Sequence, residues 1–61
     1  MMKKEITYNR VCYLIIDKEN KESVLKEYFF KYGKSIKIIK VDDFYLKEKL
    51  NCVNKLLYKI I

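Results

Sequence analysis

Hydrophobic and polar residues alternate near the start of the chain, which is the pattern of an extended strand. In residues 11–16, Val-Cys-Tyr-Leu-Ile-Ile, both parities are apolar, as in a strand that is covered on both faces. Asn9 and Arg10 could form a two-residue turn that makes this region a hairpin, but no glycine follows Asn9. We therefore expect one long strand over residues 5–17, with the hairpin as its alternative.

The apolar spacing changes in the next segment and becomes helical. Five apolar side chains recur on one helical stripe: Val24, Leu25, Tyr28, Phe29 and Tyr32. Asp17 or Asn20 can cap the start of such a helix. Gly33 follows the stripe, at the position where many helices end in a residue with positive φ. The spacing predicts a helix over residues 18–32.

Residues 35–41 are dense in β-branched side chains, and they predict a second, short strand. Asp42 or Asp43 can then cap a second helix, which we expect over residues 43–60. Its apolar positions are spaced alternately by four and three, which is the seam of a coiled-coil-like surface. We expect this seam to be a dimer interface, formed by Leu46, Leu50, Val53, Leu57 and Ile60.

This order of elements predicts a single α/β (α+β) domain over residues 1–61, with the arrangement βαβα in two layers. The helix between the strands favours a right-handed parallel crossover. A domain of about 60 residues buries only roughly 60% of the surface of its unfolded chain, and a two-stranded sheet leaves its edges open. We therefore expect a homodimer, formed through the last helix or the sheet edge, to complete the fold. The alternative is a set of β-hairpins, one turning at Gly33-Lys34, followed by one C-terminal helix.

Composition adds a strong positive charge to this picture. The chain has 14 Lys and Arg residues against 8 Asp and Glu residues, and its formal net charge is +6. Most of the excess lies in the second half of the chain. Such a charge favours nucleic acid or an acidic protein patch as the partner, although a lysine-rich composition is also typical of AT-rich coding DNA. The candidate anion contacts are Lys31, Lys34, Lys37, Lys55 and Lys59.

Few residues are available for catalysis. The chain has no histidine, so Cys12 and Cys52 lack the usual base and cannot complete a structural zinc site. We expect both thiols to be free and buried in a cytoplasmic protein. Asp17, Asp42 and Asp43 follow the two predicted strands and could hold Mg²⁺, but helix capping explains them without a metal. We predict no catalytic residue, no metal and no cofactor.

Six tyrosines offer rings that could stack on nucleic-acid bases. Most of them lie on the predicted core stripes, and Tyr8, Tyr45 and Tyr58 are the least committed to the core. The single arginine is a poor nucleic-acid signature, because arginine binds phosphate and guanine through two parallel hydrogen bonds. Binding of nucleic acid is therefore an alternative rather than the main expectation.

We expect a small non-enzymatic protein that acts by occupying the surface of a protein or nucleoprotein. Proteins this small and without catalytic groups are common on phages and mobile elements, where they inhibit host machinery such as CRISPR nucleases. The first alternative is a basic nucleic-acid-binding regulator, and the second is Mg²⁺-dependent phosphate chemistry at the carboxylates. No membrane partner is expected, because the predicted last helix is too short and too rich in Lys and Asn to span a bilayer.

Overall fold

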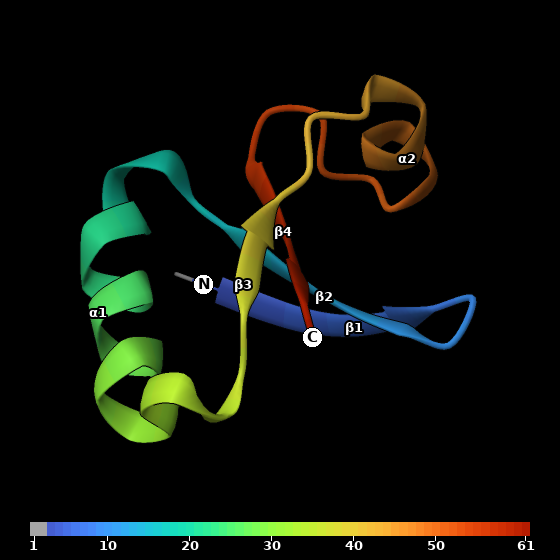
Figure 1. Cartoon of the computed structure of the whole chain (residues 1–61). Coiled ribbons are helices and arrows are strands. Elements are labelled where there is room, and N and C mark those ends of the chain that lie inside the picture. The colour runs from blue at the N-terminus through green and yellow to red at the C-terminus, as the bar shows by residue number, and fades with distance from the viewer. Residues whose placement is uncertain (1–2) are drawn as a thin grey trace.

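A computed structural model describes residues 3–61 and contains one four-stranded antiparallel sheet with two helices (Figure 1). The strands are β1 (Lys3–Tyr8), β2 (Val11–Ile16), β3 (Ile38–Lys40) and β4 (Leu56–Ile60), and their order in the sheet is β1-β2-β4-β3. The helices are α1 (Lys21–Tyr32) and α2 (Phe44–Lys49), and short 3₁₀ turns at Lys18–Asn20 and Gly33–Ser35 flank α1. The expected α+β class is therefore confirmed.

One face of the sheet packs against α1. Leu14 of β2 lies opposite Tyr58 of β4, and Val24 and Tyr28 of α1 complete this core. All four side chains are buried. Because burial of a large apolar side chain stabilises a fold by about 1.5–3 kcal/mol, this cluster holds α1 on the sheet.

The other face of the sheet has a second core. Ile15 of β2 lies opposite Leu57 of β4, and Cys52 is buried with them. Leu46 and Leu50, at α2 and just after it, pack against this cluster. The two helices therefore lie on opposite sides of the sheet (Figure 1), and the domain has three layers where the sequence predicts two.

The first segment is a hairpin, so the expectation of one long strand is wrong and its alternative is confirmed. Tyr8 at the end of β1 pairs with Val11 at the start of β2, and only Asn9 and Arg10 connect them. Both connecting residues have positive φ, 51° for Asn9 and 66° for Arg10, as type I′ hairpin turns require. Asparagine adopts positive φ readily, whereas arginine prefers negative φ. The pairing of β1 with β2 outweighs this preference of Arg10.

The helix predicted over residues 18–32 is confirmed, with a 3₁₀ turn as its first part. Neither Asp17 nor Asn20 makes the expected side-chain cap. The stop is as predicted, because Gly33 has a φ of +57° and its N–H donates to the carbonyl of Phe29.

The helix predicted over residues 43–60 is wrong beyond its first turns. Asp43 does cap α2 and accepts a hydrogen bond of 3.1 Å from the N–H of Leu46. The chain then leaves the helix, and Asn51 takes a positive φ of 57°. Residues 56–60 become β4 instead, which pairs with β2 on one side and with β3 on the other.

The insertion of β4 also overturns the expected parallel crossover. β2 and β3 do not pair with each other, since β4 lies between them and runs antiparallel to both. As a helix, residues 56–60 would leave the second edge of β2 without backbone partners. As a strand, residues 56–60 provide backbone hydrogen-bond partners for an edge of β2 and an edge of β3. This is the physical reason that they form a strand rather than a helix.

Candidate functional site

Two grooves run along α1, one on each side. The α1–β1 groove has a volume of about 220 Å³ and is lined by charged residues and tyrosines. The α1–β3 groove has a volume of about 340 Å³, and apart from tyrosine hydroxyls its lining side chains are apolar. The same helix therefore borders two surfaces of opposite chemistry.

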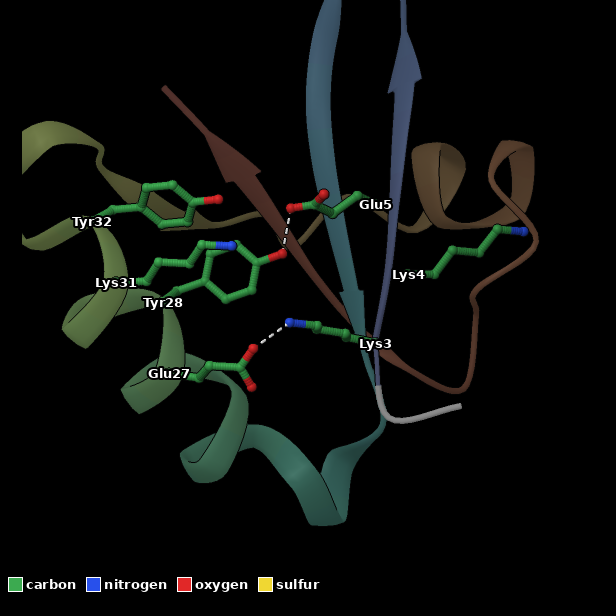
Figure 2. A pocket seen from close by; sticks show the side chains of 7 residues that line it. All are labelled: Lys3, Lys4, Glu5, Glu27, Tyr28, Lys31 and Tyr32. Atoms are coloured by element: carbon green, nitrogen blue, oxygen red, sulfur yellow. Dashed lines mark hydrogen bonds and ion pairs between the residues drawn. The ribbon is translucent and has the colours of Figure 1, made fainter.

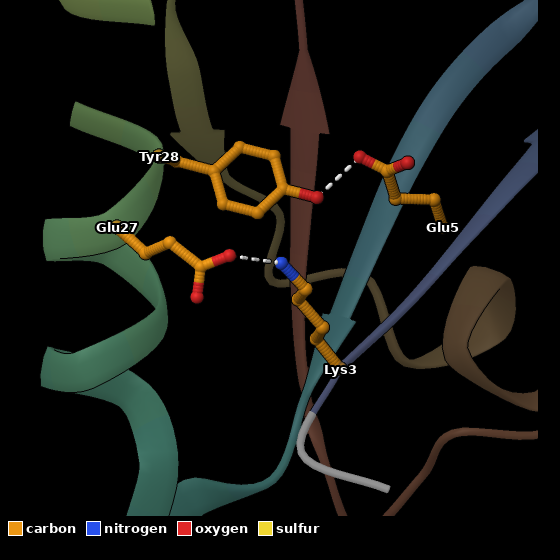
Figure 3. A network of polar contacts seen from close by, with 4 residues as sticks. All are labelled: Lys3, Glu5, Glu27 and Tyr28. Atoms are coloured by element: carbon orange, nitrogen blue, oxygen red, sulfur yellow. Dashed lines mark hydrogen bonds and ion pairs between the residues drawn. The ribbon is translucent and has the colours of Figure 1, made fainter. Parts of the chain in front are cut away.

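A network of polar contacts crosses the α1–β1 groove (Figures 2 and 3). Lys3 Nζ lies 2.7 Å from Glu27 Oε1, and the hydroxyl of Tyr28 donates a hydrogen bond to the carboxylate of Glu5. Lys3 Nζ also lies 4.7 Å from the centre of the Tyr28 ring, a cation–π geometry. β1 and α1 are thus joined by two polar contacts between residues far apart in the sequence.

The electrostatics of this network favour a structural role. The hydrogen bond from Lys3 holds the pKa of Glu27 below its ordinary value. Burial, together with the hydrogen bond to Glu5, raises the pKa of Tyr28 well above that of a free phenol. Tyr28 therefore stays protonated at neutral pH and donates a hydrogen bond to the Glu5 carboxylate.

At the rim of this groove, Lys31 Nζ lies 5.3 Å from the centre of the Tyr32 ring. Tyr32 in turn lies beside Tyr28, with 5.6 Å between the two ring centres. Lys4 points away from these residues (Figure 2). Within this groove, the polar contacts thus join Lys3 to Glu27 and Tyr28 to Glu5.

The α1–β3 groove is built from two apolar walls. Leu25 and Phe29 come from α1, and Ile36 and Ile38 come from β3 and the residues before it. Tyr58 of β4 lines the groove between them. The Phe29 side chain is 72% exposed, so this wall is open to solvent.

The surface of α1 that faces away from the sheet also carries an aromatic side chain. Phe30 is 93% exposed and lies among Ser23, Lys26, Glu27 and Lys31. The amphipathic stripe predicts Phe29 as a core residue, and Phe30 lies off that stripe. The signal that could have found this surface is an aromatic residue off the stripe and next to lysines.

Three lysines follow the end of α1 and continue along β3. We call Lys34, Lys37 and Lys40 the basic rim. All three are exposed, and within residues 3–61 none of them forms an ion pair. Lys40 shares the α1 face of the sheet with Ile38, whereas Lys37 extends toward the opposite face.

The five lysines predicted as anion contacts do not form one surface. Lys31 borders the α1–β1 groove, and Lys34 and Lys37 belong to the basic rim. Lys59 is half-buried on β4, on the face away from α1. Lys55 Nζ lies 2.6 Å from Asp17 Oδ1; their hydrogen bond lowers the pKa of Asp17 and raises the pKa of Lys55.

The predicted dimer seam is not formed. Leu57 is 1% exposed and lies in the core of the α2 face, where Leu46 and Leu50 also pack. Ile60 packs against the other core, on the α1 face, and Val53 is exposed. These side chains are divided between the two faces of the sheet because residues 56–60 are a strand.

The predicted carboxylates are used within the fold. Asp17 pairs with Lys55, Asp43 caps α2, and Asp42 is exposed. In the part of the chain that the structure describes, no three Asp, Glu, Cys or His side chains are grouped as metal ligands. Asp17 is thus part of an ion pair and Asp43 of a helix cap, and the two do not form the Mg²⁺ site considered from the sequence.

Both cysteines are free thiols, and Cys52 is buried while Cys12 is half-buried. Burial raises the pKa of the Cys52 thiol, which disfavours the reactive thiolate. Among the tyrosines judged least committed to the core, Tyr58 is buried and this expectation is wrong. Tyr45 is 67% exposed on α2, and Lys49 Nζ lies 5.3 Å from its ring centre.

Comparison of the chain with protein-family models, curated proteins and solved structures found no match. In residues 3–61, no helix has both the length and the apolar character needed to cross a bilayer.

Proposed function

We propose that this chain is a non-enzymatic binding protein that docks on an acidic patch of a protein, free or within a nucleoprotein. The docking surface consists of the outer side of α1, the α1–β3 groove and the basic rim. The observation that carries the proposal is the pair Phe29 and Phe30, which remain 72% and 93% exposed beside lysines that have no acidic partner in the described chain.

The aromatic pair supplies the energetic argument. Complete burial of a Phe side chain is worth about 1.5–3 kcal/mol, and in this chain Phe30 contributes almost none of that to the fold. Aromatic anchors near the centre of an interface, surrounded by polar residues, are typical of binding hot spots. Phe29 and Phe30 are adjacent in sequence and differ in direction by about 100° on the helix, so a partner must wrap around the α1 outer surface to cover both.

The basic rim supplies the charge argument. Lys34, Lys37 and Lys40 present three ammonium groups without an ion-pair partner in residues 3–61. Opposite charge steers association and suppresses wrong partners. An acidic protein patch therefore satisfies both the apolar and the charged part of this surface, and a protein that occupies such a patch acts as an inhibitor or an adaptor.

A second candidate function, nucleic-acid binding, is favoured by a different observation. On α2, Phe44 and Tyr45 are 62% and 67% exposed, and Lys49 lies over the Tyr45 ring. Exposed rings beside lysines are typical of single-strand binders, in which bases stack on the rings. This surface lies on the other side of the sheet from α1, so the two candidate functions use separate residues.

The test is affinity capture from cells of the native host, with and without nuclease, using three forms of the protein. They are the wild type, Phe30→Ser, and Phe44→Ser as the matched control. We expect a nuclease-resistant partner whose capture is lost with Phe30→Ser and kept with Phe44→Ser, and whose binding to the purified wild type reproduces this pattern.

Two results would overturn the proposal. One is capture that survives Phe30→Ser. The other is submicromolar binding to a naked single-stranded oligonucleotide that weakens steeply with salt and is lost with Phe44→Ser or Tyr45→Ser, which would establish the nucleic-acid function instead.

A further inference from the structure

We propose that β3 accepts an extended acidic segment of the partner as an additional strand, with alternate side chains of that segment entering the α1–β3 groove. This inference rests on the proposed function and names its mode of binding, the addition of a strand to an open sheet edge.

The backbone of β3 has the required free edge. β3 is the last strand in the order β1-β2-β4-β3, so only one of its edges is paired. Lys37 and Ile61 exchange two backbone hydrogen bonds of 3.0 and 2.8 Å, and the N–H of Val41 donates to the carbonyl of Leu57 at 2.9 Å. In an antiparallel ladder these bonds alternate along the strand, so the N–H and C=O groups of Ile38 and Lys40 point away from β4, toward the open edge.

The groove lies where side chains of an added strand would point. Ile36 and Ile38 face α1, and an adjacent strand lies about 4.8 Å from β3 with the same alternation of faces. Every second side chain of that strand would therefore extend toward Leu25 and Phe29 of α1. Figure 1 shows α1 alongside β3, in keeping with the lining of the groove by both elements.

The basic rim defines the charge of the added strand. Lys40 extends on the α1 face of the sheet and Lys37 on the opposite face, so an added strand meets a lysine on each of its faces. Lys34 follows Gly33, at the end of the groove. Carboxylates on the added segment would pair with these ammonium groups.

The same charges disfavour a second copy of this chain as the occupant. Two β3 strands paired edge to edge would crowd the basic rims of both copies, three lysines from each, along one short ladder. Like charges that lie opposite each other across strands are destabilising. The lysines of the basic rim therefore favour an acidic segment of a different protein as the strand that pairs with β3.

The other open edge of the sheet, at β1, lacks these features. On the α1 face of β1, Lys3 and Glu5 are already bound to Glu27 and Tyr28. The groove beside β1 is also lined by charged residues and tyrosines rather than by apolar side chains. β3 is therefore the edge at which an added strand finds both free backbone groups and an apolar groove.

The experiment compares Lys40→Pro with Lys40→Ala in a binding assay. The probe is a fluorescein-labelled hexapeptide of alternating Val and Glu, and its binding is measured by fluorescence anisotropy. Both variants remove the lysine charge, but only proline removes the outward N–H of residue 40. Proline is tolerated at this position because the N–H does not bond to β4, and thermal unfolding of both variants verifies the fold.

We expect Lys40→Ala to change binding of the peptide little, because Lys40 lies on the α1 face, where the probe presents Val, and the glutamates of the probe lie on the opposite face with Lys37. We expect Lys40→Pro to weaken it by about tenfold beyond the alanine variant, since one more hydrogen bond is lost. A second measurement keeps the wild-type protein and methylates alternate peptide nitrogens of the probe. Methylation in the register that faces β3 should abolish binding, and methylation in the other register should not.

Strand addition is overturned if Lys40→Pro and Lys40→Ala bind the peptide equally, if both methylated probes bind as well as the parent, or if the parent peptide does not bind. It is also overturned if the matched peptide of alternating Val and Lys binds as tightly. None of these outcomes touches the proposed function, which is tested by Phe30→Ser and Phe44→Ser on the captured partner. A partner lost with Phe30→Ser but insensitive to Lys40→Pro would keep the docking surface and reject the added strand.

Discussion

On its β1 side, α1 is fastened to the sheet by an ion pair and a phenol–carboxylate hydrogen bond, and the charged side chains there bind one another. On its β3 side the same helix meets an open apolar groove and lysines that have no acidic partner among the described residues. The difference shows how a very small domain can anchor a helix along one flank while the other flank stays open to solvent. Tyr28 lines both grooves, so it connects the two regions.

The largest effect is expected when this shared residue is removed. Tyr28→Ala deletes a ring that is 5% exposed and the hydrogen bond to Glu5, and we expect it to lower the free energy of unfolding by about 3–5 kcal/mol. That is most of the stability of a domain this small. Urea denaturation followed by circular dichroism measures the loss.

Tyr28→Phe is the matched control, since it keeps the ring and removes only the hydroxyl. We expect a loss of about 1 kcal/mol, the value of one hydrogen bond. Equal losses for the two variants would mean that the polar tie on the β1 side, rather than the packing of the ring, holds α1 on the sheet.

The next effect concerns Gly33, which ends α1 and lines the α1–β3 groove. Its φ of +57° and ψ of −123° form a backbone conformation that only glycine adopts without strain, although no atom lies within 4 Å of the place of a Cβ. Gly33→Ala should therefore destabilise the protein by about 1–3 kcal/mol through backbone strain alone. Thermal unfolding measures this loss.

Chemical synthesis of the chain with D-alanine at position 33 is the control for this substitution. D-alanine favours positive φ and should restore the stability of the glycine form. If the D- and L-alanine forms were equally unstable, a collision of the methyl group rather than backbone strain would be the cause.

A smaller effect is expected from acid, on the β1 side only. The pKa of Glu27 is lowered in the folded protein by Lys3, so its stabilising contribution is present above the ordinary pKa of glutamate, about 4.3, and is lost as the pH falls through the folded value. A double-mutant cycle of Lys3→Gln and Glu27→Gln should show a coupling energy at pH 7. The coupling should fall as the pH is lowered below the ordinary pKa of glutamate, and a coupling that did not fall in acid would contradict the assignment.

Much of the fold can be predicted from local patterns. The stripe that includes Val24 and Tyr28 predicts α1, Gly33 predicts its end, and Asp43 predicts the start of α2 because its side chain reaches the N–H three residues on. These signals act over one or two turns of chain. They need no knowledge of tertiary contacts.

The parts that fail depend on contacts between distant segments. Residues 56–60 are apolar at nearly every position, so the same residues satisfy a helical seam and a strand covered on both faces. Only the unpaired edges of β2 and β3 decide between the two. The hairpin turn was only the alternative prediction for a similar reason. Arg10 has a positive φ, which arginine disfavours, and the pairing of β1 with β2 imposes it.

The candidate site shows the same contrast between residues that local patterns predict and residues that depend on distant contacts. Lys34 and Lys37 are predicted as anion contacts near the Gly33 turn, and the structure places both in the basic rim. The contact of Glu5 with Tyr28 was not predictable, since it requires β1 to lie beside α1. Phe29 has the spacing of a core residue, and its exposure depends on how far β3 extends under the helix.

The smallest effect is expected at the α1 outer surface, where Phe30 is 93% exposed. Phe30→Ser removes a side chain that makes little contact with the fold, so the free energy of unfolding should change by no more than about 0.5 kcal/mol. Phe44→Ser, at 62% exposure on α2, should behave in the same way and serves as the control. Urea denaturation of both variants would verify this, and a loss above about 1.5 kcal/mol for Phe30→Ser would show that the ring stabilises the fold. Stability that is unchanged, together with loss of the captured partner, would separate binding from folding on the outer surface of α1, which no substitution in the α1–β1 network can do.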